Sequence, residues 1–209
     1  YTRYRYSTGF DCYQEKYIAD TLNSKMEMSS NFYSGINDLS LKADFEYFVN
    51  SNYNLTFGGI STYHQFTPGI TSYKAENDGT VPLDTMFNDT KYNSLESAVY
   101  IENQLSLGEH FNFNIGVRGT HYLIENKSFI SIEPRFLSNI LITKELSVKA
   151  SFSQMQQNVH LLSYSGMGMP TDLWIPATKK VSPEKSTQYA IGLASQLFSK
   201  NYELSIEGY

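Results

Sequence analysis

The sequence predicts an all-β protein, an antiparallel transmembrane β-barrel of which this 209-residue chain forms part. Three observations predict this class. Apolar and polar residues alternate along many segments, several of these segments are too long for an ordinary soluble sheet, and the connections between them alternate between tight turns and longer stretches. The 17 tyrosines also favour sheet over helix.

The alternation of period two is clearest from Phe111 to Leu123, where apolar side chains occupy most odd positions, and Arg118 and two asparagines occupy even ones. Residues 39–47 and 146–153 repeat the pattern, and charged side chains keep a single parity in each segment. Residues 94–107 have apolar side chains at both parities, so the sequence leaves their orientation open. About nine strands are expected, at residues 2–7, 39–47, 53–66, 94–107, 111–123, 129–142, 146–153, 186–197 and 202–209.

The connections between these strands alternate in length. Most of the longer connections are expected to be polar loops, and only residues 125–128 are short among them. An amphipathic helix at residues 14–28 is the alternative to an extended loop there, and Asn158 is a candidate N-cap for a helical turn at 159–162. Tight turns on one rim and long loops on the other are typical of outer-membrane barrels. The tight turns are expected at 50–52, 108–110, 143–145 and 199–201, and the long loops at 9–33, 67–93 and 158–185.

Strand length separates this prediction from a soluble sheet. Several expected strands have about 12 to 15 residues, whereas a typical strand of a globular protein has about 5 to 6. A strand of this length crosses a bilayer at a tilt, and aromatic residues beside the tight turns are expected to form a girdle at the membrane boundary. These aromatic residues are Tyr47, Tyr53, Phe111, Phe198 and Tyr202.

The charged residues of the strands predict which face meets lipid. A lysine or arginine on the lipid face near the middle of the membrane costs about 2 to 4 kcal/mol. The charged parity must therefore face the barrel lumen. The residues expected to line the lumen are Arg118, Glu133, Arg135 and Lys149.

Composition and motifs exclude several other functions. The formal net charge of −5, with no cluster of lysine and arginine, argues against nucleic acid as a partner. The single cysteine, Cys12, excludes an internal disulfide framework. No cofactor motif or catalytic triad pattern occurs, so we expect neither a cofactor nor an enzyme. The four histidines, His64, His110, His121 and His160, are too dispersed to predict a metal site.

The loop expected at residues 158–185 is the candidate ligand-binding segment. It gathers aromatic, apolar and acidic residues among glycines and prolines, and loops on a rigid scaffold commonly carry binding. Packing between loops is the alternative explanation for the same composition. The candidate ligand contacts are Tyr164, Asp172 and Trp174.

Several phrases resemble the barrels of TonB-dependent receptors, especially those of Bacteroidetes. They are Ile132-Glu133-Pro134-Arg135-Phe136, Gly116-Val117-Arg118-Gly119-Thr120, and the phrases at residues 168–178 and 181–193. The resemblance covers about Leu39 to Tyr209. It implies a barrel of about 22 strands, a plug domain, an external ligand, and energy supplied by the inner-membrane TonB-ExbB-ExbD complex. Residues 1–209 are then expected to be barrel wall, with no plug domain among them.

The expected function is uptake of a large nutrient, a siderophore, glycan or peptide, across the bacterial outer membrane. Outer-membrane lipid, the protein's own plug domain, the energising complex and a surface lipoprotein are the expected partners. A small autonomous barrel, structural or omptin-like and proteolytic, stays open as an alternative, as does a soluble β-sandwich binding module. The absence of a signal segment before Tyr1, and the parity of Tyr209, opposite to that of Leu204 and Ile206, favour a piece of a longer barrel.

Overall fold

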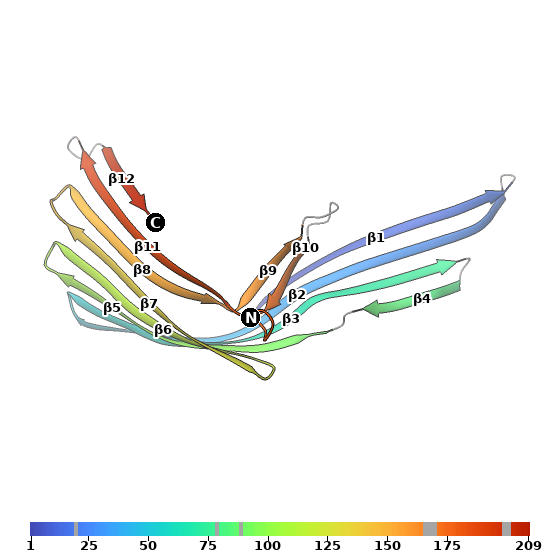
Figure 1. Ribbon diagram of the computed structural model, residues 1–209, viewed down its shortest axis with the longest axis horizontal. Coiled ribbons are helices and arrows are strands. Elements are labelled where there is room, and N and C mark those ends of the chain that lie inside the picture. The colour runs from blue at the N-terminus through green and yellow to red at the C-terminus, as the bar shows by residue number, and fades with distance from the viewer. Residues whose placement is uncertain (19–20, 78–79, 88–89, 165–170, 198–201) are drawn as a thin grey trace. The chain divides into compact units, whose positions relative to one another are not determined.

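A computed structural model describes residues 1–18, 21–77, 80–87, 90–164, 171–197 and 202–209 (Figure 1). These residues form twelve β-strands, and none of them belongs to a helix of the length and hydropathy needed to cross a membrane. The strands are β1 (Thr2–Ile18), β2 (Thr21–Asn50), β3 (Tyr53–Asn77), β4 (Thr80–Phe87), β5 (Tyr92–Leu107), β6 (Phe111–Ile124), β7 (Lys127–Leu141), β8 (Leu146–Gln157), β9 (Val159–Tyr164), β10 (Thr171–Pro176), β11 (Glu184–Leu197) and β12 (Tyr202–Gly208).

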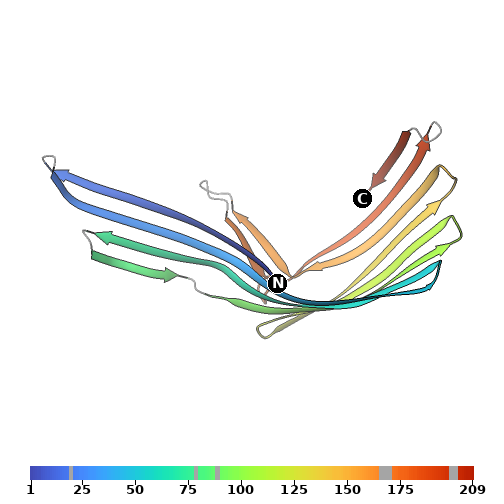
Figure 2. The same cartoon turned by 180° about the vertical axis from the view of Figure 1, so that it is seen from behind.

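Ten strands form one sheet, whose main path is β1-β2-β3-β5-β6-β7-β8-β11-β12, with β4 paired to β3. The neighbours β1/β2, β3/β4, β6/β7, β7/β8, β8/β11 and β11/β12 pair antiparallel. The nine strands of the main path are the nine that the sequence predicts. β9 and β10 pair only with each other among the described residues (Figure 2). The fold class predicted from the alternation is therefore confirmed.

Strand structure extends into all three expected long loops. β1 and β2 pair continuously from Thr2 opposite Asp38 to Ile18 opposite Thr21, with one irregularity at Lys16/Tyr17. The described part of residues 14–28 is thus strand, and both the loop and the helix predicted there are wrong. Pairing between the two strands determines this structure, and the helical spacing of apolar residues within one segment does not predict such pairing.

The other two loops give the same result. Residues 67–93 contain the end of β3 and all of β4, and residues 158–185 contain the β9/β10 hairpin. Val159–Tyr164 is strand rather than a helical turn, so the prediction that Asn158 caps a helix is wrong. Of the predicted tight turns, those at 50–52, 108–110 and 143–145 are present, and 199–201 lies outside the described residues, as does Phe198 of the predicted girdle. Gly108 has φ +64°, a conformation that glycine adopts without strain.

The chain divides into two compact units, which we describe separately. Unit 1 comprises residues 1–39, 63–94 and 159–177. Its buried centre includes Phe66, Ser34 and His64, whose Nδ1 lies 2.8 Å from Oδ1 of Asp38. The β9/β10 hairpin belongs to this unit.

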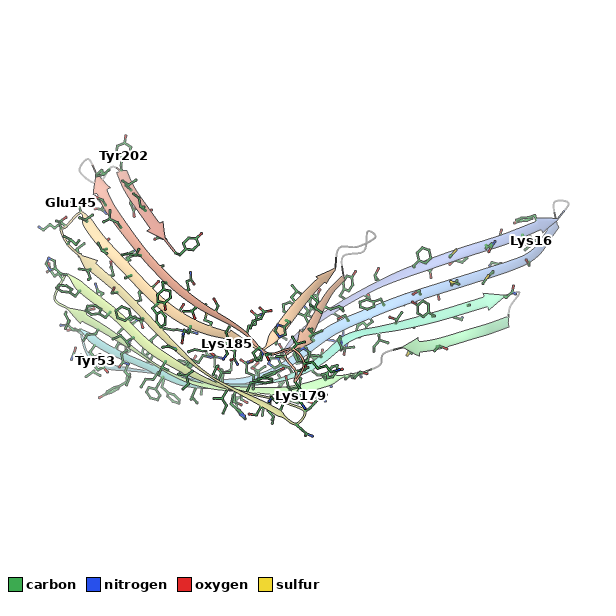
Figure 3. All side chains as sticks on the ribbon, in the orientation of Figure 1. Lys16, Tyr53, Glu145, Lys179, Lys185 and Tyr202 are labelled. Carbon is green, nitrogen blue, oxygen red and sulfur yellow. The ribbon has the colours of Figure 1, made fainter. Side chains whose placement is uncertain are left out.

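Unit 2 comprises residues 40–62, 95–158 and 178–209. It holds the three described tight turns; Tyr53 follows the first and Glu145 belongs to the third, and Tyr202 begins β12 (Figure 3). Many large apolar side chains of this unit are exposed rather than gathered in a centre, among them Leu41, Ile130, Ile132, Ile191 and Ile206. These exposed apolar side chains indicate that unit 2 is a sheet with two different faces and not a globule with a core.

Candidate functional site

The two faces of unit 2 differ in chemistry. On one face, side-chain hydrogen bonds run from strand to strand: Asn54 to Glu46, Tyr100 to Asp44, and Asn114 to Glu102. We call this the polar face; it also carries Lys42, Glu96, Arg118, Glu133, Arg135 and Lys149.

The opposite face, the apolar face, is built from aromatic and aliphatic side chains. Phe45 stacks on Phe57 with ring centroids 5.4 Å apart, and Phe152 lies 5.1 Å from Tyr189. A shallow depression of about 560 Å³ on this face is lined mainly by small and aliphatic residues, including Ala43, Gly59, Val99, Gly119, Ile130 and Ile132. It offers few polar groups, so the candidate site lies on the polar face instead.

A cluster of opposite charges lies on the polar face around Arg118. Arg118 is the register partner of Glu133, and its Nη2 lies 3.9 Å from Oε1 of Glu96 on β5. Glu133 is only 5% exposed, and Oε1 accepts hydrogen bonds from the hydroxyls of Thr120 (3.0 Å) and Ser131 (2.8 Å). These two hydroxyl donors satisfy the hydrogen-bonding need of a carboxylate that is largely removed from solvent.

Two further groups extend this cluster. Arg135 Nη2 lies 4.0 Å from Oε2 of Glu133. Asn158, almost fully buried, donates from Nδ2 to Oε2 of Glu96 (2.9 Å) and accepts from Nε2 of Gln156 (3.0 Å). The cluster therefore links β5, β6 and β7 to the end of β8.

A second group of polar side chains lies beside the first. Tyr100 on β5 crosses β3 at Gly58 and donates a hydrogen bond to Asp44 on β2, which also pairs with Lys42. Between the two groups lies a hollow of about 160 Å³, which Lys42, Tyr100, Glu102, Arg118 and Arg135 help to line. Three cations around one hollow can bind an anionic group through charge-assisted hydrogen bonds.

The structure brings three of the four predicted lumen residues together. Arg118, Glu133 and Arg135 form the cluster above. Lys149 lies on the same face, opposite Asn139 of β7 and Gly192 of β11, but further along the sheet. The sequence reasoning missed Glu96, Asn158 and Tyr100. Glu96 and Tyr100 share their even parity with Ala98, so the sequence left that parity ambiguous, and nothing in the sequence indicates Asn158.

The three predicted ligand contacts all lie on the β9/β10 hairpin. Tyr164 is opposite Thr171, and Asp172 is opposite Ser163. The Trp174 ring is half-buried and packs edge-on against Tyr4 of β1, with centroids 6.4 Å apart. Trp174 thus packs against a strand of unit 1 rather than against another loop, and its role in ligand contact stays a prediction. Among the described residues, no group of three or more metal-ligating side chains is found.

The comparison with known proteins agrees with this geometry. The family model described as "TonB dependent receptor-like, beta-barrel" matches residues 1–209. No curated protein matches the chain. Among solved structures, the RagAB peptide importer in its closed-closed state is similar at a TM-score of 0.59 and 13% identity, covering 98% of this chain and 26% of that one.

Two other solved structures are similar. The RagAB peptide transporter gives a TM-score of 0.55 at 12% identity, covering 88% of this chain and 24% of that one. The complex of FpvAI with pyocin S2 gives 0.52 at 12% identity, covering 98% and 29%. The chain therefore spans about a quarter of the length of these proteins, and at such identities the likeness shows the fold. Through the family match over its whole length, the chain belongs to the β-barrel family of TonB-dependent receptors, which are outer-membrane transporters and not enzymes.

Proposed function

We propose that this chain is a section of barrel wall in an importer that takes up a large nutrient, a siderophore, glycan or peptide, by TonB-dependent transport. The polar face lines the lumen and the apolar face contacts lipid. The separation of charges onto one face of unit 2 is the observation that supports this proposal. Arg118 and Lys149 on a lipid face would each cost about 2 to 4 kcal/mol near the membrane centre, a cost that a watery lumen removes.

The proposal assigns roles to the groups described above. The hollow between Lys42, Arg118 and Arg135 offers cations to an anionic group of the plug domain or of a passing nutrient. The β9/β10 hairpin carries the outer ligand contacts Tyr164, Asp172 and Trp174. Residues 1–209 are all wall, and the plug domain belongs to another part of the protein. The TonB-ExbB-ExbD complex is the proposed energising partner, and a surface lipoprotein is a further one.

Neighbouring cysteines on β8 test which face meets water. Ala150 pairs with Ser138 and Ile191 on the apolar face, and Ser151 pairs with Leu137 and Ala190 on the polar face. In the full-length protein with Cys12→Ser, and any other native cysteine removed, Ser151→Cys should react with a charged, membrane-impermeant thiol reagent, whereas Ala150→Cys should not. Labelling is measured on intact outer membranes. The reverse pattern would contradict the proposed orientation.

Uptake by cells tests the import itself. Cells that lack the gene for the full-length protein are compared with complemented cells, using three labelled probes: a ferric catecholate siderophore, maltoheptaose and an alanine-rich oligopeptide. Uptake of one probe should require the gene and should stop when a protonophore removes the energy that the TonB complex uses. If uptake of all three probes is independent of the gene and of the protonophore, the import proposal fails for these nutrient classes.

A further inference from the structure

The polarity of β2 changes parity along the strand. From residue 39 to 47 the odd-numbered side chains are apolar, beginning with Leu39 and Leu41, and the even-numbered ones include Lys42 and Asp44. From residue 25 to 37 the pattern is reversed. The odd positions there are Lys25, Glu27, Ser29, Asn31, Tyr33, Gly35 and Asn37, and the even ones include Met26, Met28 and Phe32.

This reversal identifies where the strand leaves the hydrocarbon, if the apolar face of residues 39–47 meets lipid as proposed above. A side chain that points toward lipid is apolar, and the same parity becomes polar where water or head groups replace the acyl chains. The change falls between Asn37 and Leu39. The end of the wall that carries the long hairpins is the outer one, so this boundary belongs to the outer leaflet.

Two arginines lie at this boundary, on the odd parity of β1. Arg3 is opposite Asn37 and Arg5 is opposite Gly35, and both side chains are exposed. The Arg5 guanidinium lies 5.9 Å from the centre of the Tyr33 ring. A shallow depression of about 210 Å³ beside them is lined by Tyr1, Asn37, Asp38, Leu39, Tyr63 and Gln65.

Arg3 and Arg5 differ from two lysines of unit 1 that form ion pairs. Lys25 forms an ion pair with Glu27, whose hydrogen bond and charge raise the pKa of that ammonium, and Lys74 lies 3.7 Å from Glu76. Within the described part of the chain, no carboxylate lies within 4.0 Å of the Arg3 or Arg5 guanidinium. The Asp38 carboxylate, the nearest acid along β2, is engaged by His64 instead. On β2, the one strand that pairs with β1 among the described residues, the register partners of Arg3 and Arg5 are Asn37 and Gly35, so β2 places no acid directly across from these two arginines.

We infer that Arg3 and Arg5 bind the phosphate of an outer-leaflet lipid. Guanidinium groups match phosphate oxygens in geometry and charge, and two of them next to an apolar belt complement a molecule with an anionic head and acyl chains. Tyr33 and Tyr63 supply the amphipathic rings that favour the head-group level. The nutrient is not the occupant, because these side chains share the odd parity of the lipid-facing Leu39 rather than that of the lumen.

The test uses the full-length receptor in detergent and measures bound lipid by native mass spectrometry. The probes are dimyristoyl phosphatidic acid and dimyristoylglycerol, which share acyl chains and differ in the phosphate. Arg3→Gln/Arg5→Gln is compared with Lys16→Gln/Lys74→Gln, which removes the same charge; Lys16 lies at the far end of β1 (Figure 3). The arginine variant should bind phosphatidic acid about 30-fold more weakly, and the lysine variant should bind it like the wild type.

Each other outcome has a defined meaning. Equal binding of phosphatidic acid by the wild type and the arginine variant, or equal binding of both lipids by the wild type, overturns the inference. The inference is also overturned if native mass spectrometry detects a dimer of the wild-type receptor that the arginine variant does not form. The arginines would then join two receptors rather than bind lipid. Heat-modifiable migration on gels checks that each variant is a folded barrel. The inference rests on the proposed orientation. If lipid binding depends on the arginines but no probe is taken up in a gene-dependent way, the result counts against the import proposal alone.

Discussion

Replacing Phe136 with arginine is expected to prevent assembly of the barrel, whereas replacing its neighbour Leu137 with arginine is expected to be tolerated. Phe136 lies on the apolar face, opposite Ile115 and Phe152, and Leu137 lies on the polar face, opposite Asn114 and Ser151. An arginine in the lipid region costs about 2 to 4 kcal/mol, and the lost packing against Phe113 adds to this cost.

The two variants are matched because each exchanges a large apolar side chain, partly exposed, for the same cation. The measurement is the fraction of full-length receptor in the outer membrane that shows heat-modifiable migration. Leu137→Arg controls for the added charge and for the lost apolar bulk. Equal assembly of the two variants would mean that both faces of β7 meet the same medium.

Replacing Gly58 with alanine is expected to destabilise the wall by about 1 to 3 kcal/mol, the usual range for an overpacked site. A Cβ at Gly58 would lie 2.5 Å from the backbone oxygen of Ala43 and 2.8 Å from both the Asp44 carboxylate and the Tyr100 hydroxyl. Because one of these atoms belongs to the backbone of β2, the strand itself must move. The hydrogen bond that Tyr100 sends across β3 is then lost as well.

Gly59 provides the control for this substitution. A Cβ at Gly59 would meet its nearest neighbour, the Ala98 backbone oxygen, at 3.4 Å, which is ordinary contact. Gly59→Ala should therefore leave stability close to that of the wild type, or raise it slightly by restricting the unfolded chain. Urea unfolding of the full-length receptor in lipid vesicles measures both variants. A loss of stability in Gly59→Ala equal to that in Gly58→Ala would show that packing at Gly58 is not the cause.

In the proposed orientation each face of a wall strand meets a different medium, and the sequence therefore predicts these strands well. Phe111, Phe113 and Ile115 alternate with polar residues for that reason, and the three tight turns within the described residues follow from the same pattern. Residues 94–107 resisted this reasoning, since Ala98 and Tyr100 are apolar enough to suggest lipid. The bond from Tyr100 to Asp44 places that parity on the polar face.

The strands of unit 1 could not be predicted in the same way. The alternation of β1 is weak, because β1 exposes Phe10 on one parity and Tyr13 on the other. The contact between Glu96 and Asn158 joins residues 62 positions apart and depends on where β8 ends, which no local pattern encodes. Local periodicity therefore predicts the faces of the strands but not these long-range partners.

The strict parity of β7 has a consequence for how the strands find their neighbours. If the apolar face meets lipid as proposed, a slip of β7 by one residue against β6 would turn Glu133 and Arg135 toward the hydrocarbon and Ile132 and Phe136 toward water. A one-residue misalignment would thus place charged side chains in lipid and apolar side chains in water. The charges of β7 therefore disfavour every alignment with β6 that is shifted by an odd number of residues.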